Sequence, residues 1–178
     1  MLPCISLIIW RQADYGQPHD IEILLTLRSA FQYDDPSRAQ PRDFYRGWQI
    51  FPSGKLEAGE GSPLSAAWSK LRDDGGVRAM IGLKALVGSN PTRLRRVDQN
   101  CFAVEIKKSD DFDGDSDFLN LVNLSPNYIL VTWKPLAEIF NFSDLTPYRH
   151  GVPKGVEAIF GDQLNLIRKL ADQLRRTT

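Results

Sequence analysis

Charged side chains with helical spacing follow the glycine-rich stretch that begins at Gly54. Lys70, Asp73 and Asp74 are spaced as i, i+3 and i+4, so in a helix their side chains face one way. A lysine in an enclosed pocket can attract an anionic ligand as a fixed cation, or serve as a base when burial favours its neutral form. Lys70 could instead form a salt bridge with Asp73 or Asp74 and have no chemical role. The sequence leaves both interpretations open.

The stretch from residue 48 to 77 resembles the catalytic box of Nudix hydrolases, written G-x5-E-x7-R-E-U-x-E-E-x-G-U with U a bulky aliphatic residue. Gly54 and Glu60 have the spacing of the first half of that box. The helical half aligns if one extra residue lies near Gly61. Two further segments are similar to the family's early strand and its late strand-to-helix corner, residues 23–28 and 132–136. The resemblance covers most of the chain and is strongest in the first half of the box.

The resemblance implies that a phosphoanhydride is hydrolysed with Mg²⁺ or Mn²⁺ held by box carboxylates. The metal ligands that it implies here are Asp73, Asp74 and Glu60. The first helical position of the set, however, is Lys70. At about 4 Å and an effective dielectric constant of about 20, a lysine repels a divalent cation by roughly 8 kcal/mol before any relaxation. This position therefore argues against an efficient hydrolase.

Two other box positions depart from the family pattern. The arginine that pairs with a box glutamate and orients it is Ser69 here, so Glu60 lacks its usual partner unless Arg72 reaches it. Ser53 replaces the first glycine of the common Gly-Gly-Lys turn and can alter the backbone there. A hydrolase built on this box would depend on the four acidic residues that remain in it, Glu57, Glu60, Asp73 and Asp74.

Three functions stay open. The first is a degenerate box, changed at Ser69, Lys70, Asp73 and Asp74, that binds or transforms a small anionic or aromatic molecule without standard diphosphate hydrolysis. It would have an isomerase- or cyclase-type role in small-molecule metabolism and would require no cofactor. The second is a genuine Mg²⁺- or Mn²⁺-dependent hydrolase of nucleoside diphosphate-linked compounds. The third is a non-catalytic binding module. The candidate catalytic residues are Lys70, Asp73, Asp74 and Glu60.

Candidate substrate-binding residues are mostly aromatic or basic: Trp68, Phe44, Tyr45, Arg96 and His150. Trp68 lies next to the changed box positions and can line a cavity or belong to the core. Phe44 and Tyr45 end a long loop, residues 29–46, that can cover a ligand or be an ordinary insertion. Arginine forks suit phosphate oxygens, and histidine is the usual acid–base residue near neutral pH. For Arg96 and His150 a purely structural role is the alternative.

The loop between residues 109 and 117 is acidic, but it lacks the glycine and glutamate positions of a calcium-binding loop. We expect it to be a solvated loop. In the family, a carboxylate from this later region can complete the metal site or act as base. Glu105 and Asp111 are the candidates for that role here.

Hydrophobic patterning predicts the elements that must position these residues. Strands are predicted at residues 5–10, 21–28, 47–52, 83–87, 99–106 and 128–133. Helices are predicted at 63–72, where Ser62 can cap the first turn, at 135–140, and at the C-terminus, where apolar residues from Val156 to Leu174 repeat at helical spacing. The resemblance implies an α/β fold, the Nudix-type α/β/α sandwich with a mixed β-sheet between the box helix and the C-terminal helix.

Composition is that of an ordinary globule: 178 residues, 42% hydrophobic and 25% charged, with 22 basic and 22 acidic residues. We expect residues 1–178 to form a single Nudix-like domain. The zero net charge argues against a nucleic-acid partner, and no apolar run is long enough for a membrane helix. Cys4 and Cys101 are isolated and are expected to be reduced thiols. We expect a cytoplasmic protein with a small-molecule ligand, and a homodimer is possible because Nudix-like domains often form dimers.

Overall fold

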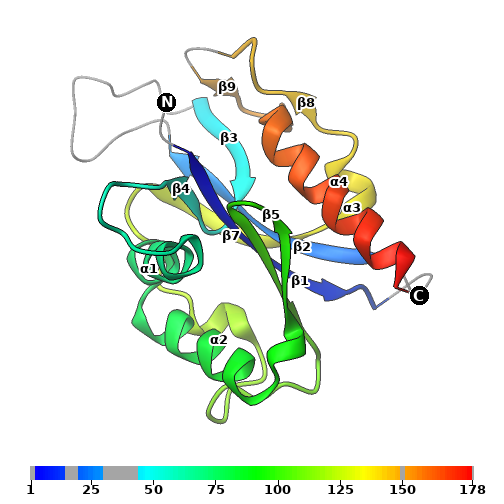
Figure 1. Ribbon diagram of the computed structural model, residues 1–178. Helices are drawn as coiled ribbons and strands as arrows, with labels where there is room; N and C mark the ends of the chain where they lie inside the picture. The colour runs from blue at the N-terminus through cyan, green and yellow to red at the C-terminus, as the bar shows by residue number, and fades with distance from the viewer. Residues whose placement is uncertain (1–2, 15–19, 30–43, 149–150, 178) are drawn as a thin grey trace.

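The structure is a computed structural model that describes residues 3–14, 20–29, 44–148 and 151–177. A mixed β-sheet forms its centre (Figure 1), with strands in the order β5-β6-β1-β2-β3-β10-β8. Strands β4, β7 and β9 lie off this path and pair with β1, β2 and β3 respectively. The strands are β1 (Cys4–Gln12), β2 (Ile21–Ser29), β3 (Phe44–Ile50), β4 (Ser53–Lys55), β5 (Leu94–Asp98), β6 (Cys101–Ile106), β7 (Tyr128–Pro135), β8 (Ser143–Asp144), β9 (Val152–Pro153) and β10 (Ala158–Ile159).

Helices cover the sheet on both faces (Figure 1). They are α1 (Pro63–Gly75), α2 (Val77–Ser89), α3 (Leu136–Ile139) and α4 (Gly161–Arg176), with short 3-10 turns at Pro91–Arg93 and Phe118–Leu121. Side chains alternate between the two faces of the sheet along a strand, so successive residues of β1 face opposite helical layers. Leu7 and Ile9 pack in the core under α1 and α2, whereas Ile8 and Trp10 pack in the core under α3 and α4. These two cores confirm the predicted sandwich.

One predicted strand is wrong. Residues 83–87 belong to α2, which runs from Val77 to Ser89. A short apolar run cannot be assigned to strand or helix by periodicity alone. Leu83 is fully buried, and Met80, Leu86 and Val87 pack around it at helical spacing against the core under α1. The strand in this region is β5, which contains Arg95 and Arg96.

Two element boundaries also differ from the sequence prediction. Phe44 and Tyr45, expected in the long loop, begin β3, where they pair with Pro153 and Val152 of β9. The C-terminal helix begins only at Gly161, because the preceding apolar residues 158–159 form β10 beside β3. None of the helices among the described residues is long and apolar enough to cross a membrane.

Candidate functional site

Helix α1 is defined by its two ends and by one apolar face. The Ser62 hydroxyl accepts a hydrogen bond from the backbone N–H of Ser65 at 3.2 Å, and Pro63 occupies the first turn. The helix ends at Gly76, whose φ of 92° is unfavourable for other residues. Its buried residues, among them Ala67 and Leu71, pack against the sheet. This packing fixes which side chains of α1 face the turn that contains Gly54.

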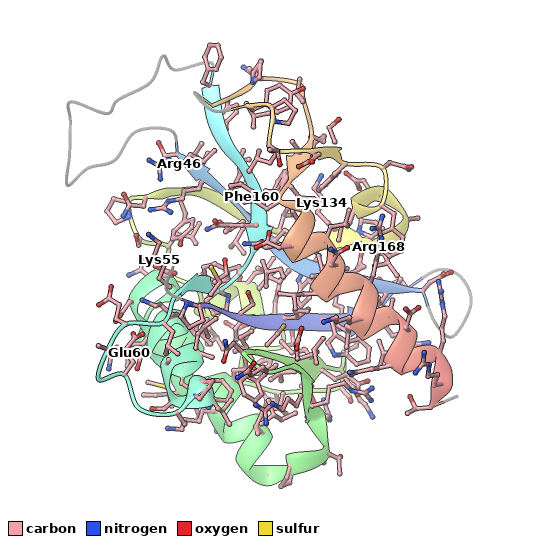
Figure 2. The ribbon with its side chains drawn as sticks, turned by 45° about the horizontal axis from the view of Figure 1, so that its top comes forward. Arg46, Lys55, Glu60, Lys134, Phe160 and Arg168 are labelled. Atoms are coloured by element: carbon pink, nitrogen blue, oxygen red, sulfur yellow. The ribbon has the colours of Figure 1, made fainter. Side chains whose placement is uncertain are left out.

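Lys70 lies directly over that turn. A Cβ atom built on Gly54 would be only 3.2 Å from both Cδ and Cε of Lys70 and 3.8 Å from its Nζ. Lys70 Nζ lies 3.6 Å from Oε1 of Glu60, and both side chains are mostly buried, with 20% and 22% exposed. The other oxygen of Glu60 accepts a hydrogen bond of 2.7 Å from the backbone N–H of Glu57. The lysine therefore pairs with Glu60, and not with Asp73 or Asp74 as one interpretation of the sequence allowed. Figure 2 shows Glu60 and Lys55 beside α1, whereas Arg168 lies along α4.

Gly54→Ala is expected to displace the Lys70 ammonium with little loss of stability. The new methyl group would meet the flexible end of a side chain, and Gly54 does not have a positive φ, so the backbone can accommodate alanine. We expect affinity for an anion at Lys70 to fall severalfold, measured by calorimetry with pyrophosphate. Gly88→Ala is the control, since that position in α2 faces open space. Equal affinities for the two variants would contradict the close packing of Lys70 on the turn.

Asp73 and Asp74 point in different directions. The side chain of Asp73 is 58% exposed and pairs with Arg72 at 3.1 Å, so Arg72 does not serve as the partner of Glu60. Asp74 turns toward the sheet, where its Oδ2 accepts a hydrogen bond of 3.0 Å from the hydroxyl of Tyr128 in β7. Of the helical triplet, therefore, Lys70 and Asp74 lie on the inner side of α1 and Asp73 faces solvent.

Asp74 is the centre of a partly buried polar group. Burial raises the pKa of its carboxyl, opposed by the Tyr128 hydrogen bond and by the charges of Arg28 and Lys70. Burial likewise raises the pKa of Tyr128, assisted by the nearby charge of Asp74, so the phenol remains protonated. Gln49 of β3 also hydrogen-bonds the phenol. The site thus combines two cations, two carboxyl groups and a phenol between α1 and the sheet.

The similarity of this chain to known proteins lies in its fold. No known family profile and no curated protein matches the sequence. The structure of a C. elegans Ap4A hydrolase binary complex aligns with 98% of this chain and 98% of its own, at 15% identity and a TM-score of 0.51. A second C. elegans Ap4A hydrolase structure aligns with 97% of this chain and 98% of its own, at 15% identity and a TM-score of 0.45. Ap4A hydrolase is a Nudix hydrolase. This chain has the Nudix fold.

The carboxylates that the sequence resemblance implies as metal ligands do not converge on one point among the described residues. Lys70 places an ammonium next to Glu60, Asp73 faces solvent, and Asp74 is engaged by Tyr128. Within the described ranges, no three His, Cys, Asp or Glu side chains come together in a way that could hold a metal ion. A site for Mg²⁺ needs several oxygen ligands directed at one point. The described arrangement supplies instead separated carboxylates, each with a partner from the protein.

The predicted substrate-binding residues are dispersed over the Nudix fold. Trp68 is 8% exposed and packs in the core under α1. Phe44 and Tyr45 are half-buried at the start of β3. Arg96 donates to the backbone oxygens of Asp98 and Gln99 and so holds the turn of its own hairpin. His150 lies outside the described residues. A substrate-binding role for these five remains a prediction.

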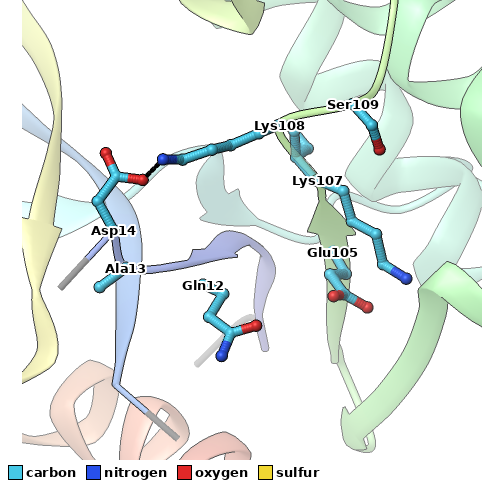
Figure 3. Close-up of a pocket in the computed structure, with 8 residues that line it drawn as sticks. Gln12, Ala13, Asp14, Glu105, Lys107, Lys108 and Ser109 are labelled. Atoms are coloured by element: carbon cyan, nitrogen blue, oxygen red, sulfur yellow. Dashed lines mark ion pairs between the residues drawn. The ribbon is translucent and has the colours of Figure 1, made fainter. Parts of the chain in front are cut away.

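Glu105 and Asp111 do not lie with Lys70 and Glu60. Glu105 pairs in register with Trp10, so its side chain lies on the sheet face opposite to α1, in a cavity of about 560 Å³ at the ends of β1 and β6. An ion pair between Asp14 and Lys108 spans this cavity (Figure 3). Asp111 accepts a hydrogen bond from the backbone N–H of Gly114 and shapes the acidic loop. Neither carboxylate can complete a metal site at Glu60.

Sequence reasoning did not find Tyr128, Arg28 and Gln49 as members of the site. Each belongs to a segment that was predicted as a strand, but nothing in a single strand shows which face meets α1. The alternation of β2 carried a usable signal, since Leu24 and Thr26 share a face with Arg28 and Leu24 lies in the core under α1. The pairing of Arg28 with Tyr128 in β7 then completes the group.

Proposed function

We propose that this Nudix-fold protein binds a small anionic molecule at Lys70 and does not carry out standard metal-dependent diphosphate hydrolysis. The observation that carries the proposal is the placement of the Lys70 ammonium over Gly54 and beside Glu60. At 3.6 Å, the contact between Nζ and Oε1 is an ion pair that is too long for a good hydrogen bond. The three N–H donors of the ammonium are therefore available to an oxyanion.

Neighbouring groups support this use of Lys70. Glu60 is held by the backbone N–H of Glu57, so it can orient the ammonium without moving toward it. Arg28 is a second cation on the same side of the sheet, and its charge partly opposes the rise in the pKa of Asp74 that burial causes. Two cations at a partly buried site favour a ligand with at least one negative charge. If the ligand is transformed, Asp74 and Lys70 are the acid–base groups that an isomerase- or cyclase-type reaction would use.

The test is binding of inorganic pyrophosphate in the presence of EDTA, measured by calorimetry. The protein should bind pyrophosphate without metal, and Lys70→Ala should weaken the affinity at least about tenfold, because a charge-assisted contact is lost. Lys84→Ala, at an exposed position of α2, is the control and should leave the affinity unchanged. Binding that requires Mg²⁺ or Mn²⁺, or that tolerates Lys70→Ala, would contradict the proposal.

A second candidate is a Mg²⁺- or Mn²⁺-dependent hydrolase of nucleoside diphosphate-linked compounds. It is favoured by the structural similarity to Ap4A hydrolase and by the acidic residues that remain in the box, Glu57, Glu60, Asp73 and Asp74. Release of phosphate or of a nucleoside monophosphate with either metal, lost in the double variant of Asp73 and Asp74 to alanine, would establish it. A non-catalytic binding module is the third candidate function. We further propose a cytoplasmic setting, a free small-molecule ligand, no nucleic-acid partner and assembly as a homodimer.

A further inference from the structure

Gln163, in the first turn of α4, holds the strand end that leads into the glycine turn. Its Oε1 accepts a hydrogen bond of 2.7 Å from the backbone N–H of Ile50. Its Nε2 donates to the hydroxyl of Ser53 at 3.4 Å. One carboxamide therefore contacts both ends of the short connection between β3 and β4.

The sheet topology explains why a side chain is needed there. On its outer edge β3 pairs with β10, whose described register joins Ile159 to Trp48. The chain then leaves the sheet to begin α4 at Gly161, so β10 does not extend as far as Ile50. Ile50 is fully buried, and a buried N–H without a partner is costly. Gln163 supplies the acceptor that a longer strand would have supplied.

The same contact reaches the candidate site. Ser53 is followed by Gly54, and because Gly54 has no side chain, Cδ and Cε of Lys70 can pack closely against its backbone. Ser53 is also the residue that replaces the usual glycine of the turn, and its hydroxyl is what Gln163 contacts. Helix α4, on one face of the sheet, is thus connected through Ser53 and Gly54 to the Lys70 ammonium on the other face.

We propose that Gln163 is a positioning residue that holds the turn from Ile50 to Gly54 under Lys70 and so strengthens anion binding. This inference rests on the proposed function, because it assigns to Gln163 the placement of the cation that binds the anion. It also gives a role to the unusual Ser53. The carboxamide itself does not touch the ligand.

The test compares Gln163→Met with Gln173→Met in the full chain. Gln173 is the matched control, since it lies on the same helix and contacts the backbone oxygens of Arg96 and Val97 at the other end. Gln163→Met should weaken metal-free pyrophosphate binding roughly 3- to 10-fold, the range of one or two lost hydrogen bonds. Gln173→Met should not. Ser53→Ala should weaken binding less, and the double variant should match Gln163→Met alone, because both residues act through one contact.

A second readout separates positioning from loss of stability. Amide hydrogen exchange should become faster at residues 53–55 in Gln163→Met and remain unchanged there in Gln173→Met. Equal pyrophosphate affinities for these two variants, while Lys70→Ala still weakens binding at least about tenfold, would overturn the positioning role alone. Pyrophosphate binding that is insensitive to Lys70→Ala would instead overturn the proposed function, and the positioning role with it.

Discussion

Lys70→Glu is expected to abolish metal-free pyrophosphate binding and to create affinity for Mg²⁺ or Mn²⁺. The substitution replaces an ammonium beside Glu60 with a carboxylate. Asp74 lies close enough for the charge at position 70 to act on the pKa of its carboxyl. At about 4 Å and an effective dielectric constant of about 20, one such charge reversal changes the interaction with a divalent cation by roughly 16 kcal/mol before relaxation. Even a small part of that figure exceeds the energy of a tenfold change in affinity, about 1.4 kcal/mol.

The experiment has two arms, pyrophosphate calorimetry in EDTA and metal titration without pyrophosphate. Lys70→Gln is the control, because it removes the positive charge without adding a negative one. It should lose pyrophosphate binding and gain little metal affinity. Appearance of diphosphate hydrolysis in Lys70→Glu with Mg²⁺ would show that the box is a changed hydrolase site. If Lys70→Glu kept wild-type pyrophosphate affinity in EDTA, Lys70 would not be the anion-binding group.

The ion pair between Arg93 and Asp110 is expected to be the most important single polar contact for stability. Arg93 binds both oxygens of Asp110, at 2.8 and 2.9 Å, and only 10% and 7% of these side chains are exposed. Asp110 also accepts a hydrogen bond from the backbone N–H of Lys107 at 2.6 Å. Asp110→Asn leaves the guanidinium buried without its counter-ion, which should reduce the free energy of unfolding by about 3 kcal/mol. Urea denaturation at neutral pH measures the difference.

This effect should depend on pH with a defined sign. Burial opposes the charged form of Asp110, but the hydrogen bonds from Arg93 and Lys107 hold the pKa of the carboxyl below its usual range. The stabilisation is therefore complete above the ordinary aspartate pKa of about 3.9 and is lost as the pH falls through the lower pKa of the folded state. Asp172→Asn, in an exposed pair with Arg175, should cost less than about 1 kcal/mol. An equally small loss for Asp110→Asn would show that the buried pair contributes nothing net.

Local pattern and the family resemblance that it carries predicted the fold class and indicated where to look for a candidate site. The spacing of Gly54 and Glu60, the helix that starts after Ser62, and the alternation of β1 all depend on neighbouring residues, so they can be recognised in a single sequence. The same local rules failed at residues 83–87, because a short apolar run satisfies both a strand and a buried helix. There the choice depends on what the run packs against, and in the structure Leu83, on α2, packs in the core under α1.

The partners within the site were decided by tertiary structure alone. The spacing predicted that Lys70 shares one helix face with Asp73 and Asp74, but in the structure Asp73 faces solvent and Lys70 pairs with Glu60. Asp74 and Tyr128 are 54 positions apart, and Gln163 and Ser53 are 110 apart. Helical and strand periodicities describe only a few neighbouring residues. Contacts between distant segments arise from the burial of the two cores on either side of the sheet, which fixes the face and register of every strand that carries them.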